Sequence, residues 1–457
     1  MTDRDPDDFA QFAQMFENAS GEERRAAARR DPLDPATRAR RRRLARIVAL
    51  AVVGTIVAAI AVYVPLALNA PIGAAASTVH LPPVAPGSAA KLVFPEGEES
   101  AISVSGADAY LGPNASGILA SSGGDNAVPM ASISKLITAL VILSKKPLTT
   151  SSPGPSITFS KADHALYDKY YLLNATIAAM PTGSSMSEHD AIETMLVVSA
   201  CNYSEAMVDW AFGSTGGFVT AAKKWLAANG MTHTTMVEST GIDARNTSTP
   251  SDLIALGKLA MANPVIAEIV AKQGLDIPFL TGMPSTNTLL GTDGVTGIKT
   301  GTLEDYGSDL LFSATVPVTG LEQPLTVIGV VLGGGTRESV NDDVTRLIDS
   351  LRAGFHEVSV AEDDEKVGRY TTPWGASATM VLGSSASVFT YSDTKITSTM
   401  TTSTLKTGKD GEKVGSVTWK AGTSTVTVPV VLQGSIAPPS AWWRLTHPQQ
   451  LWQRAAP

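Results

Sequence analysis

Two short motifs, far apart in the sequence, constrain this chain more than its composition does. Ser132 and Lys135 stand at the start of an apolar, helix-like segment at 129–143, and a Lys-Thr-Gly-Thr stretch follows at 299–302. A spacing of three places the Ser132 hydroxyl and the Lys135 amine on one helical face, one turn apart. The positive end of the helix dipole also stabilises a developing oxyanion there. This is the geometry of a nucleophile beside its base, although the same spacing is common in ordinary capped helices.

The second motif lies in a short predicted strand, 294–302, which is rich in β-branched residues and bounded by glycines. Lys299 would attract a terminal carboxylate, and Gly301, which has no side chain, lets a peptide lie along the strand edge. Alone, the segment also fits a surface strand with a solvated lysine. In this order, S-x-x-K and then K-T-G, the two motifs match the signature of penicillin-binding proteins and class A β-lactamases.

The surrounding sequence extends this resemblance over roughly 91–355. The segments that carry it are 129–143, 241–260, 294–302 and 307–315. Together they resemble the D-alanyl-D-alanine carboxypeptidases among the low-molecular-mass penicillin-binding proteins. The resemblance implies an α+β fold, in which a β-lactamase/transpeptidase-like domain, an antiparallel sheet with a helical cluster, is followed by a small all-β domain. Candidate strands at 299–302, 309–316 and 325–332 agree with one antiparallel sheet.

The resemblance also implies roles for individual residues. Ser132 would attack the substrate carbonyl, Lys135 would accept its proton, and repulsion from Lys299 would keep a neutral Lys135 amine accessible. Ser199 would relay the proton to the departing D-alanine. The carboxylate of that D-alanine would be held by Lys299, Thr300 and Thr302. The backbone amides of Ser132 and Thr302 would form an oxyanion hole. No metal and no organic cofactor is implied.

One position departs from the family pattern. The family carries Ser-x-Asn between the outer motifs, whereas this chain has Ser199, Ala200 and then Cys201, with Asn202 one position late. An amide donates and accepts hydrogen bonds well, and a thiol does both poorly. Cys201 and Asn202 therefore both remain candidates for the substrate-binding role of the motif asparagine, and activity is expected.

Composition excludes several classes of function. The net charge is −8 and no folded-looking segment is strongly basic, which argues against a nucleic-acid partner. Cys201 is the single cysteine, so neither an intrachain disulfide framework nor a cysteine-based zinc site can form. The six histidines show no metal-binding spacing.

The N-terminal region predicts a membrane anchor. An arginine cluster at 38–46 precedes an uncharged apolar run, 47–68, of about the 20 residues that a bilayer span requires. The apolar region of a cleaved signal peptide would be shorter and closer to Met1. By the positive-inside rule the arginines remain cytoplasmic and the rest of the chain is exported.

These observations predict six regions: a disordered cytoplasmic tail (1–46), a transmembrane helix (47–68), a linker (69–90), a penicillin-binding D,D-peptidase domain (91–357), a small β domain (358–436) and a C-terminal tail (437–457). The predicted protein is a single-pass protein of the bacterial cell membrane with an extracellular catalytic domain. It would trim peptidoglycan stem peptides that end in D-Ala-D-Ala through an acyl-enzyme, and β-lactams would inhibit it. Two alternatives remain: a β-lactamase, or a penicillin-binding scaffold impaired by Cys201.

Overall fold

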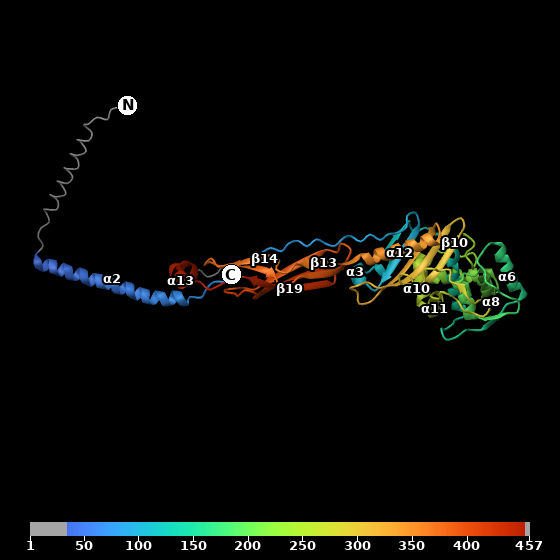
Figure 1. The fold of residues 1–457 in the computed structure, drawn as a ribbon, viewed down its shortest axis with the longest axis horizontal. Coiled ribbons are helices and arrows are strands. Elements are labelled where there is room, and N and C mark those ends of the chain that lie inside the picture. Colours follow the sequence, from blue (N-terminus) through green and yellow to red (C-terminus); the bar gives the residue numbers. More distant parts are fainter. Residues whose placement is uncertain (1–33, 453–457) are drawn as a thin grey trace, which may run out of the picture.

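The described part of the computed structural model comprises residues 34–452. Most of the predicted disordered tail, 1–33, lies outside the described residues, as do the last five residues. The described chain is elongated (Figure 1). A long N-terminal helix leads to a β domain, and the mixed domain that carries both motifs lies furthest from the helix.

The N-terminal helix, α2, spans Pro35–Asn69 and is long and apolar enough to cross a membrane. Asp34 caps its start by accepting a hydrogen bond from the Ala36 amide. The structure differs from the predicted boundary, because the arginine cluster at 38–46, which we placed in the disordered tail, forms the first turns of α2. Arginine and alanine have high helix propensity, so a helix nucleated in the apolar run extends back through them.

The mixed domain is built on a five-stranded antiparallel sheet in the order β10-β11-β12-β2-β3. The prediction of an antiparallel sheet with a helical cluster is confirmed, and β10, which carries the second motif, lies at a sheet edge. The strands are β2 (Glu99–Ser105), β3 (Ala120–Ser122), β10 (Val295–Leu303), β11 (Gly307–Val316) and β12 (Leu325–Gly334).

Helices cover both faces of this sheet. On one face, Leu310 and Phe312 of β11 share a core with Val344 and Leu347 of α12 (Arg337–Ala353). On the other face, Leu311 joins the larger core of the helical cluster, because successive side chains of a strand point to opposite faces. The cluster comprises α5 (Ser134–Lys145), α6 (Lys161–Leu172), α7 (Glu188–Val197), α8 (Cys201–Phe212), α9 (Thr215–Ala228), α10 (Pro250–Ala262) and α11 (Pro264–Val270).

Short elements complete the mixed domain. Two short helices, α3 (Asp108–Leu111) and α4 (Ala115–Ile118), follow β2, and a 3₁₀ turn, η1 (Ala131–Ile133), precedes α5. Three two-stranded ribbons pair β4 (Val128–Pro129) with β7 (Thr247–Ser248), β5 (Ser156–Thr158) with β6 (Ser185–Ser187), and β8 (Gly274–Leu275) with β9 (Met283–Pro284).

The region after α12 is entirely β until the C-terminal helices. Its main sheet has the order β1-β14-β15-β19-β18-β17, in which β1 is contributed by the segment before the mixed domain. A separate pair of strands, β13 and β16, completes the region. Val367, Met380, Trp419 and Val428 belong to its core. The strands are β1 (Ala76–Val79), β13 (Phe355–Ala361), β14 (Lys366–Thr371), β15 (Ser377–Leu382), β16 (Ala386–Tyr391), β17 (Ile396–Thr402), β18 (Lys413–Ala421) and β19 (Ser424–Gln433).

The segment predicted as a linker, 69–90, is attached to the domains. Within it, β1 pairs antiparallel with β14 at the edge of the main β sheet. Further along, the amides of Ala90 and Val93 each donate to a serine hydroxyl of the folded domains, both at 2.9 Å. We call residues 75–93 the strap, which runs along both domains in blue in Figure 1. Its composition is typical of a flexible linker, but an exposed sheet edge offers backbone partners to any extended segment.

The C-terminal tail folds back toward α2. It contains α13 (Ala441–Thr446) and α14 (Pro448–Trp452), and α13 lies beside the end of α2 (Figure 1). The Trp374 indole of the β domain donates to the Ala437 carbonyl at 2.9 Å, and its ring contacts the Trp443 ring edge-on. The tail therefore contacts both the β domain and the long helix.

Candidate active site

Ser132 and Lys135 form a direct hydrogen bond. Ser132 lies in the 3₁₀ turn η1, and Lys135 lies in the first turn of α5. The Lys135 Nζ is 2.8 Å from the Ser132 Oγ and donates a second hydrogen bond, 2.7 Å long, to the Thr240 carbonyl. Lys135 is completely buried, so its amine is held by these two oxygens rather than by water. The serine hydroxyl and the lysine amine are thus placed as a nucleophile and a base require.

A loop at 238–246 holds the Lys135 partner in place. The Glu238 carboxylate accepts hydrogen bonds from the Thr240 and Gly241 amides, and the Asn246 amide group donates to Glu238 and to the Ser134 hydroxyl. Gly241 has a φ of +82°, and a Cβ there would lie 1.8 Å from the Ala131 carbonyl oxygen. Only glycine therefore fits where this loop crosses η1.

The second motif lies against the same 3₁₀ turn. Lys299 and Thr300 are buried on β10, and the Lys299 Nζ donates to the Thr300 carbonyl at 3.1 Å. A Cβ on Gly301 would lie 2.9 Å from the Ala131 Cβ and 2.9 Å from a carboxylate oxygen of Asp309. The absence of a side chain at Gly301 thus allows β10 to approach η1, which brings the two motifs together.

Arg337, a residue that sequence reasoning missed, extends the cationic side of the site. It is the first residue of α12, and its Nε donates to the Thr302 hydroxyl at 3.0 Å. Two positions before Thr302 on β10, Thr300 uses its hydroxyl to donate a hydrogen bond of 2.8 Å to the Thr286 hydroxyl. Arg337 starts a helix 35 positions after Thr302. No local motif marks it, and only the fold brings it to β10.

Burial and the neighbouring positive charges act on Lys299. The pKa of Lys299 lies well below its ordinary value, chiefly because burial disfavours the charged ammonium and then because of repulsion from Lys135 and Arg337. Cys201 acts in the opposite direction on Lys299. A substrate carboxylate beside Lys299 would favour the charged form of this lysine, because it supplies an opposite charge.

The third motif occupies the junction between α7 and α8. Ser199 is buried in this junction with a φ of +65°, and Cys201 is the buried first residue of α8. Asn202 is also buried, but its amide oxygen accepts from the Ala178 amide at 3.1 Å and its amide nitrogen donates to the Ala178 carbonyl at 2.8 Å. The Asn202 amide therefore fixes a neighbouring loop. Of the two candidates for the motif asparagine, the geometry favours Cys201.

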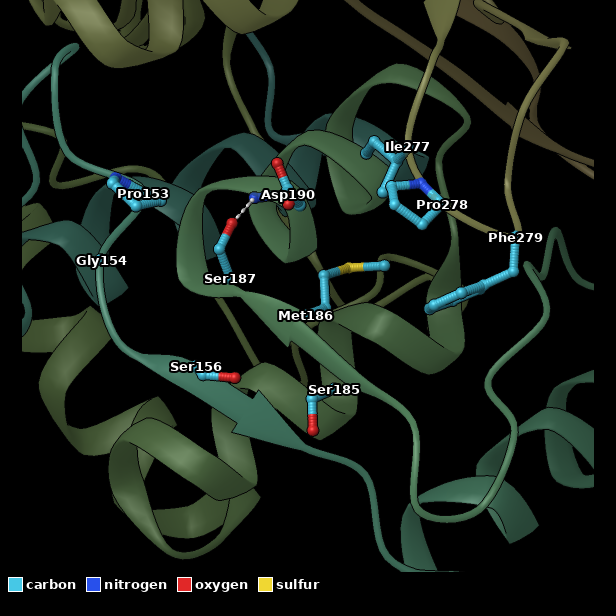
Figure 2. Close-up of a pocket in the computed structure, with 10 residues that line it drawn as sticks. All are labelled: Pro153, Gly154, Ser156, Ser185, Met186, Ser187, Asp190, Ile277, Pro278 and Phe279. Atoms are coloured by element: carbon cyan, nitrogen blue, oxygen red, sulfur yellow. Dashed lines mark hydrogen bonds between the residues drawn. The ribbon is translucent and has the colours of Figure 1, made fainter.

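A separate hollow of about 280 Å³ lies in the helical part of the domain (Figure 2). It is lined by Met186, Asp190 and Phe279 among others, and the Ser187 hydroxyl accepts from the Asp190 amide at 3.0 Å. None of the predicted site residues lines it. His189, Asp190 and Glu193 lie close enough for a metal, but the Lys272 ammonium already pairs with Glu193 at 2.7 Å, which fits an ion-pair network better.

Comparison with known proteins supports the family resemblance. A family model described as D-alanyl-D-alanine carboxypeptidase matches residues 99–336. The chain is 28% identical over 220 residues to a D-alanyl-D-alanine endopeptidase of Pseudomonas aeruginosa, a match that covers 46% of this chain and 67% of that protein. It is 26% identical over 223 residues to the D-alanyl-D-alanine carboxypeptidase DacC of Escherichia coli, covering 48% of this chain and about half (54%) of DacC.

Two solved structures match the chain at low identity. Penicillin binding protein 5 from Haemophilus influenzae matches with a TM-score of 0.49 and 16% identity, covering 79% of this chain and 100% of that chain. The Streptomyces K15 DD-transpeptidase matches with a TM-score of 0.47 and 22% identity, covering 60% of this chain and 98% of that chain.

Proposed function

Because the chain belongs to the D-alanyl-D-alanine carboxypeptidase family of serine peptidases, we propose that it is a membrane-anchored carboxypeptidase that trims peptidoglycan stem peptides. The predicted family and enzyme class are confirmed at this level. The observation that carries the proposal is the 2.8 Å contact between the Lys135 Nζ and the Ser132 Oγ, beside the buried Lys299 on β10. The substrate class, acyl-enzyme route and membrane topology are the proposed parts.

In the proposed acylation step, the Ser132 Oγ attacks the carbonyl carbon of the penultimate D-alanine while a neutral Lys135 accepts the serine proton. The carbonyl oxygen becomes an oxyanion held by the backbone amides of Ser132 and Thr302. One such donor contributes roughly 3–4 kcal/mol in comparable enzymes. The Thr240 carbonyl, 2.7 Å from the Lys135 Nζ, keeps the amine directed at the serine.

In the second half of the step, the tetrahedral intermediate collapses and the C–N bond breaks. Ser199 relays the proton to the departing amine, so that D-alanine leaves as a neutral amine with its carboxylate intact. Lys299, Thr300, Thr302 and Arg337 hold that carboxylate, a role for which three hydroxyl or ammonium donors and a guanidinium are suited. Water then hydrolyses the ester on Ser132 and regenerates the free serine.

Mass spectrometry of the purified protein with a peptide ending in D-Ala-D-Ala tests the proposed activity. We expect loss of one alanine from the peptide, and a covalent adduct on Ser132 after incubation with penicillin. Rapid release of hydrolysed penicillin would favour the alternative of a β-lactamase. Neither an adduct nor a shortened peptide would favour the impaired scaffold.

We also propose that α2 spans the membrane with the arginine cluster in the cytoplasm. The positive charge on one side of the apolar run supports this orientation. Protease added to intact protoplasts should remove the domains beyond α2, while an epitope tag before Pro35 should stay protected. A tag that is cleaved without permeabilisation would reverse the topology.

Replacing Cys201 by asparagine tests its position in the site. If the Cys201 side chain faces the substrate, Cys201→Asn should raise the acylation rate by roughly two- to tenfold, because an amide adds one net hydrogen bond of about 0.5–1.5 kcal/mol. The rate of penicillin adduct formation measures this. Asn202→Ala serves as the contrasting variant, because it should mainly lower the thermal midpoint by releasing Ala178. An unchanged rate in Cys201→Asn would remove Cys201 from the site.

A further inference from the structure

We propose that the hollow of about 280 Å³ beside the start of α7 is a subsite for one neutral sugar ring of the glycan that carries the stem peptides. This inference rests on the proposed function, because that glycan is attached to the peptides that the enzyme would trim. It goes beyond that function, because it assigns a second substrate contact away from the catalytic serine. Sites for drug-sized ligands enclose about 300–1,000 Å³, so a slightly smaller hollow suits a single ring.

One wall of the hollow is apolar. Ile277, Pro278 and Phe279 form it in the loop between β8 and β9, and the Met186 side chain extends toward the Phe279 ring (Figure 2). Phe279 is 47% exposed and has a φ of +58°, a left-handed conformation that is rare for a bulky side chain. Residues held in such conformations cluster at ligand sites. The backbone thus keeps a largely uncovered aromatic ring at the hollow.

The opposite groups of the lining are polar. Ser156 and Ser185 come from the β5–β6 ribbon, and Ser187 and Asp190 come from the start of α7. Within residues 34–452 the Asp190 carboxylate accepts no hydrogen bond, and the nearest cationic group is the His189 Nδ1 at 3.5 Å. The carboxylate can therefore accept hydrogen bonds from a ligand, and the serine hydroxyls can donate or accept them.

A buried carboxyl group lies next to the lining. Gly154, which belongs to the lining, has a φ of +74°, and a Cβ there would lie 3.0 Å from a carboxylate oxygen of Glu188. Glu188 is only 1% exposed, and its Oε1 has no hydrogen-bond partner in the described part of the chain. An unpaired buried oxygen costs free energy. The Glu188 carboxyl group thus adds unused hydrogen-bonding capacity beside the hollow.

This combination suits a neutral sugar ring better than an ion. A pyranose has C–H groups on its faces and hydroxyls around its rim, so it can stack on Phe279 while its hydroxyls donate to Asp190. An anion would be repelled by Asp190, and none of the ten residues that line the hollow in Figure 2 is cationic. An ammonium group would find one carboxylate in the lining, which already faces His189.

The hollow and the active site are connected by α7. Asp190 lies in the first turn of this helix, and Val197, its last residue, lies about 10 Å further along the axis. The Val197 carbonyl accepts from the Thr286 amide at 3.0 Å, and Ser199 follows Val197 by two residues. An extended peptide of three or four residues spans roughly 10–14 Å. A separation of this order is within the reach of a short peptide that joins a sugar to the scissile bond.

Saturation-transfer NMR with a peptide-free tetramer of N-acetylglucosamine tests the subsite on the full-length protein in detergent. We expect the wild type to bind the tetramer, and Phe279→Asn to bind it about tenfold more weakly. Asparagine removes the ring but tolerates the left-handed backbone. Asp190→Ala should weaken binding similarly. The matched control, Tyr171→Asn, removes a 67% exposed ring of α6 and should bind like the wild type.

Two results would overturn the subsite: no binding by the wild type, or unchanged binding in Phe279→Asn. If Asp190→Ala does not fold, Phe279→Asn decides, because its side chain is partly exposed. Binding of Nα-acetyl-lysine in place of the tetramer, lost in Phe279→Asn, would identify an amine site and would also overturn the proposal.

Kinetics separate failure of the subsite from failure of the proposed function. A free D-Ala-D-Ala peptide should be cleaved equally by the wild type and by Phe279→Asn, whereas the same peptide linked to a sugar should show a higher KM in the variant with the same kcat. A protein that releases D-alanine but binds no sugar would contradict the subsite alone. One that binds the tetramer but releases no D-alanine would contradict the proposed function alone.

Discussion

Ser132→Ala is expected to abolish both penicillin adduct formation and D-alanine release, with a fall in kcat of roughly 10⁴- to 10⁶-fold. No other hydroxyl is hydrogen-bonded to the Lys135 amine among the residues that the structure describes, so no substitute nucleophile stands beside the base. Mass spectrometry of the protein after exposure to penicillin measures the adduct directly. Ser132 is half-buried and the substitution removes a single hydroxyl, so the variant should fold normally.

The matched control is Ser144→Ala, the same substitution near the end of α5, the helix that follows Ser132. The Ser144 hydroxyl donates only to the Val141 carbonyl within α5. This variant should retain full adduct formation. An adduct that persists in Ser132→Ala would show that a different residue is the nucleophile, and the assigned roles of Lys135 and the 238–246 loop would fall with it.

Lys299→Met is expected to separate activity from stability. The loss of a charged hydrogen bond of about 1.5–3 kcal/mol to the substrate carboxylate should lower kcat/KM by roughly 10- to 150-fold. The fold should instead become more stable, because a fully buried cation that faces Lys135 and Arg337 is replaced by an apolar side chain of similar shape. Kinetics with a D-Ala-D-Ala peptide and thermal unfolding measure the two effects.

The stability effect depends on pH with a defined sign. Since the pKa of Lys299 is lower in the folded than in the unfolded protein, the unfolded state binds more protons between the two values. The free-energy cost of burying the charged Lys299 ammonium is therefore present at low pH. The stability of the wild-type protein rises as the pH increases from the lowered pKa of Lys299 toward the ordinary lysine pKa. Lys299→Met should lack this rise, whereas exposed Lys406→Met should keep it. A Lys299→Met protein that melts lower than the wild type at neutral pH would contradict this account.

The sequence predicted the parts of the site that lie on regular elements. Lys135 follows Ser132 by a fixed helical spacing, and Lys299 to Thr302 lie on a strand with clear β texture, so local pattern was sufficient. The turn that carries Ser132 is 3₁₀ rather than α, since the tight approach of Gly241 and Gly301 shapes it. Such an approach depends on tertiary packing and leaves no local signal.

Other parts of the site depend on long-range packing. Asn246 belongs to the segment 241–260, which carries the family resemblance, and Glu238 lies just before it. The hydrogen bonds of Glu238 with Thr240 and of Asn246 with Ser134 follow no spacing rule. The local sequence around Arg337 indicates only the first residue of a capped helix. The sequence of the strap predicts a linker, because nothing local indicates its pairing with β14, which follows the catalytic domain in sequence. In each case the partner is chosen by the fold and not by neighbouring residues.

The pairing of β1 with β14 has a consequence for the biogenesis of the protein. β1 precedes the catalytic domain and β14 follows it, so the catalytic domain is an insertion between two strands of the β sheet. If the chain is exported from its N-terminal end, as the proposed topology requires, β1 emerges first and stays unpaired until the whole catalytic domain has been translocated. On that route the β sheet cannot be completed before the catalytic domain has been translocated. Once β14 has paired with β1, both ends of the catalytic domain are connected to the same β sheet. Two chain connections instead of one then resist rotation of the catalytic domain relative to the β domain.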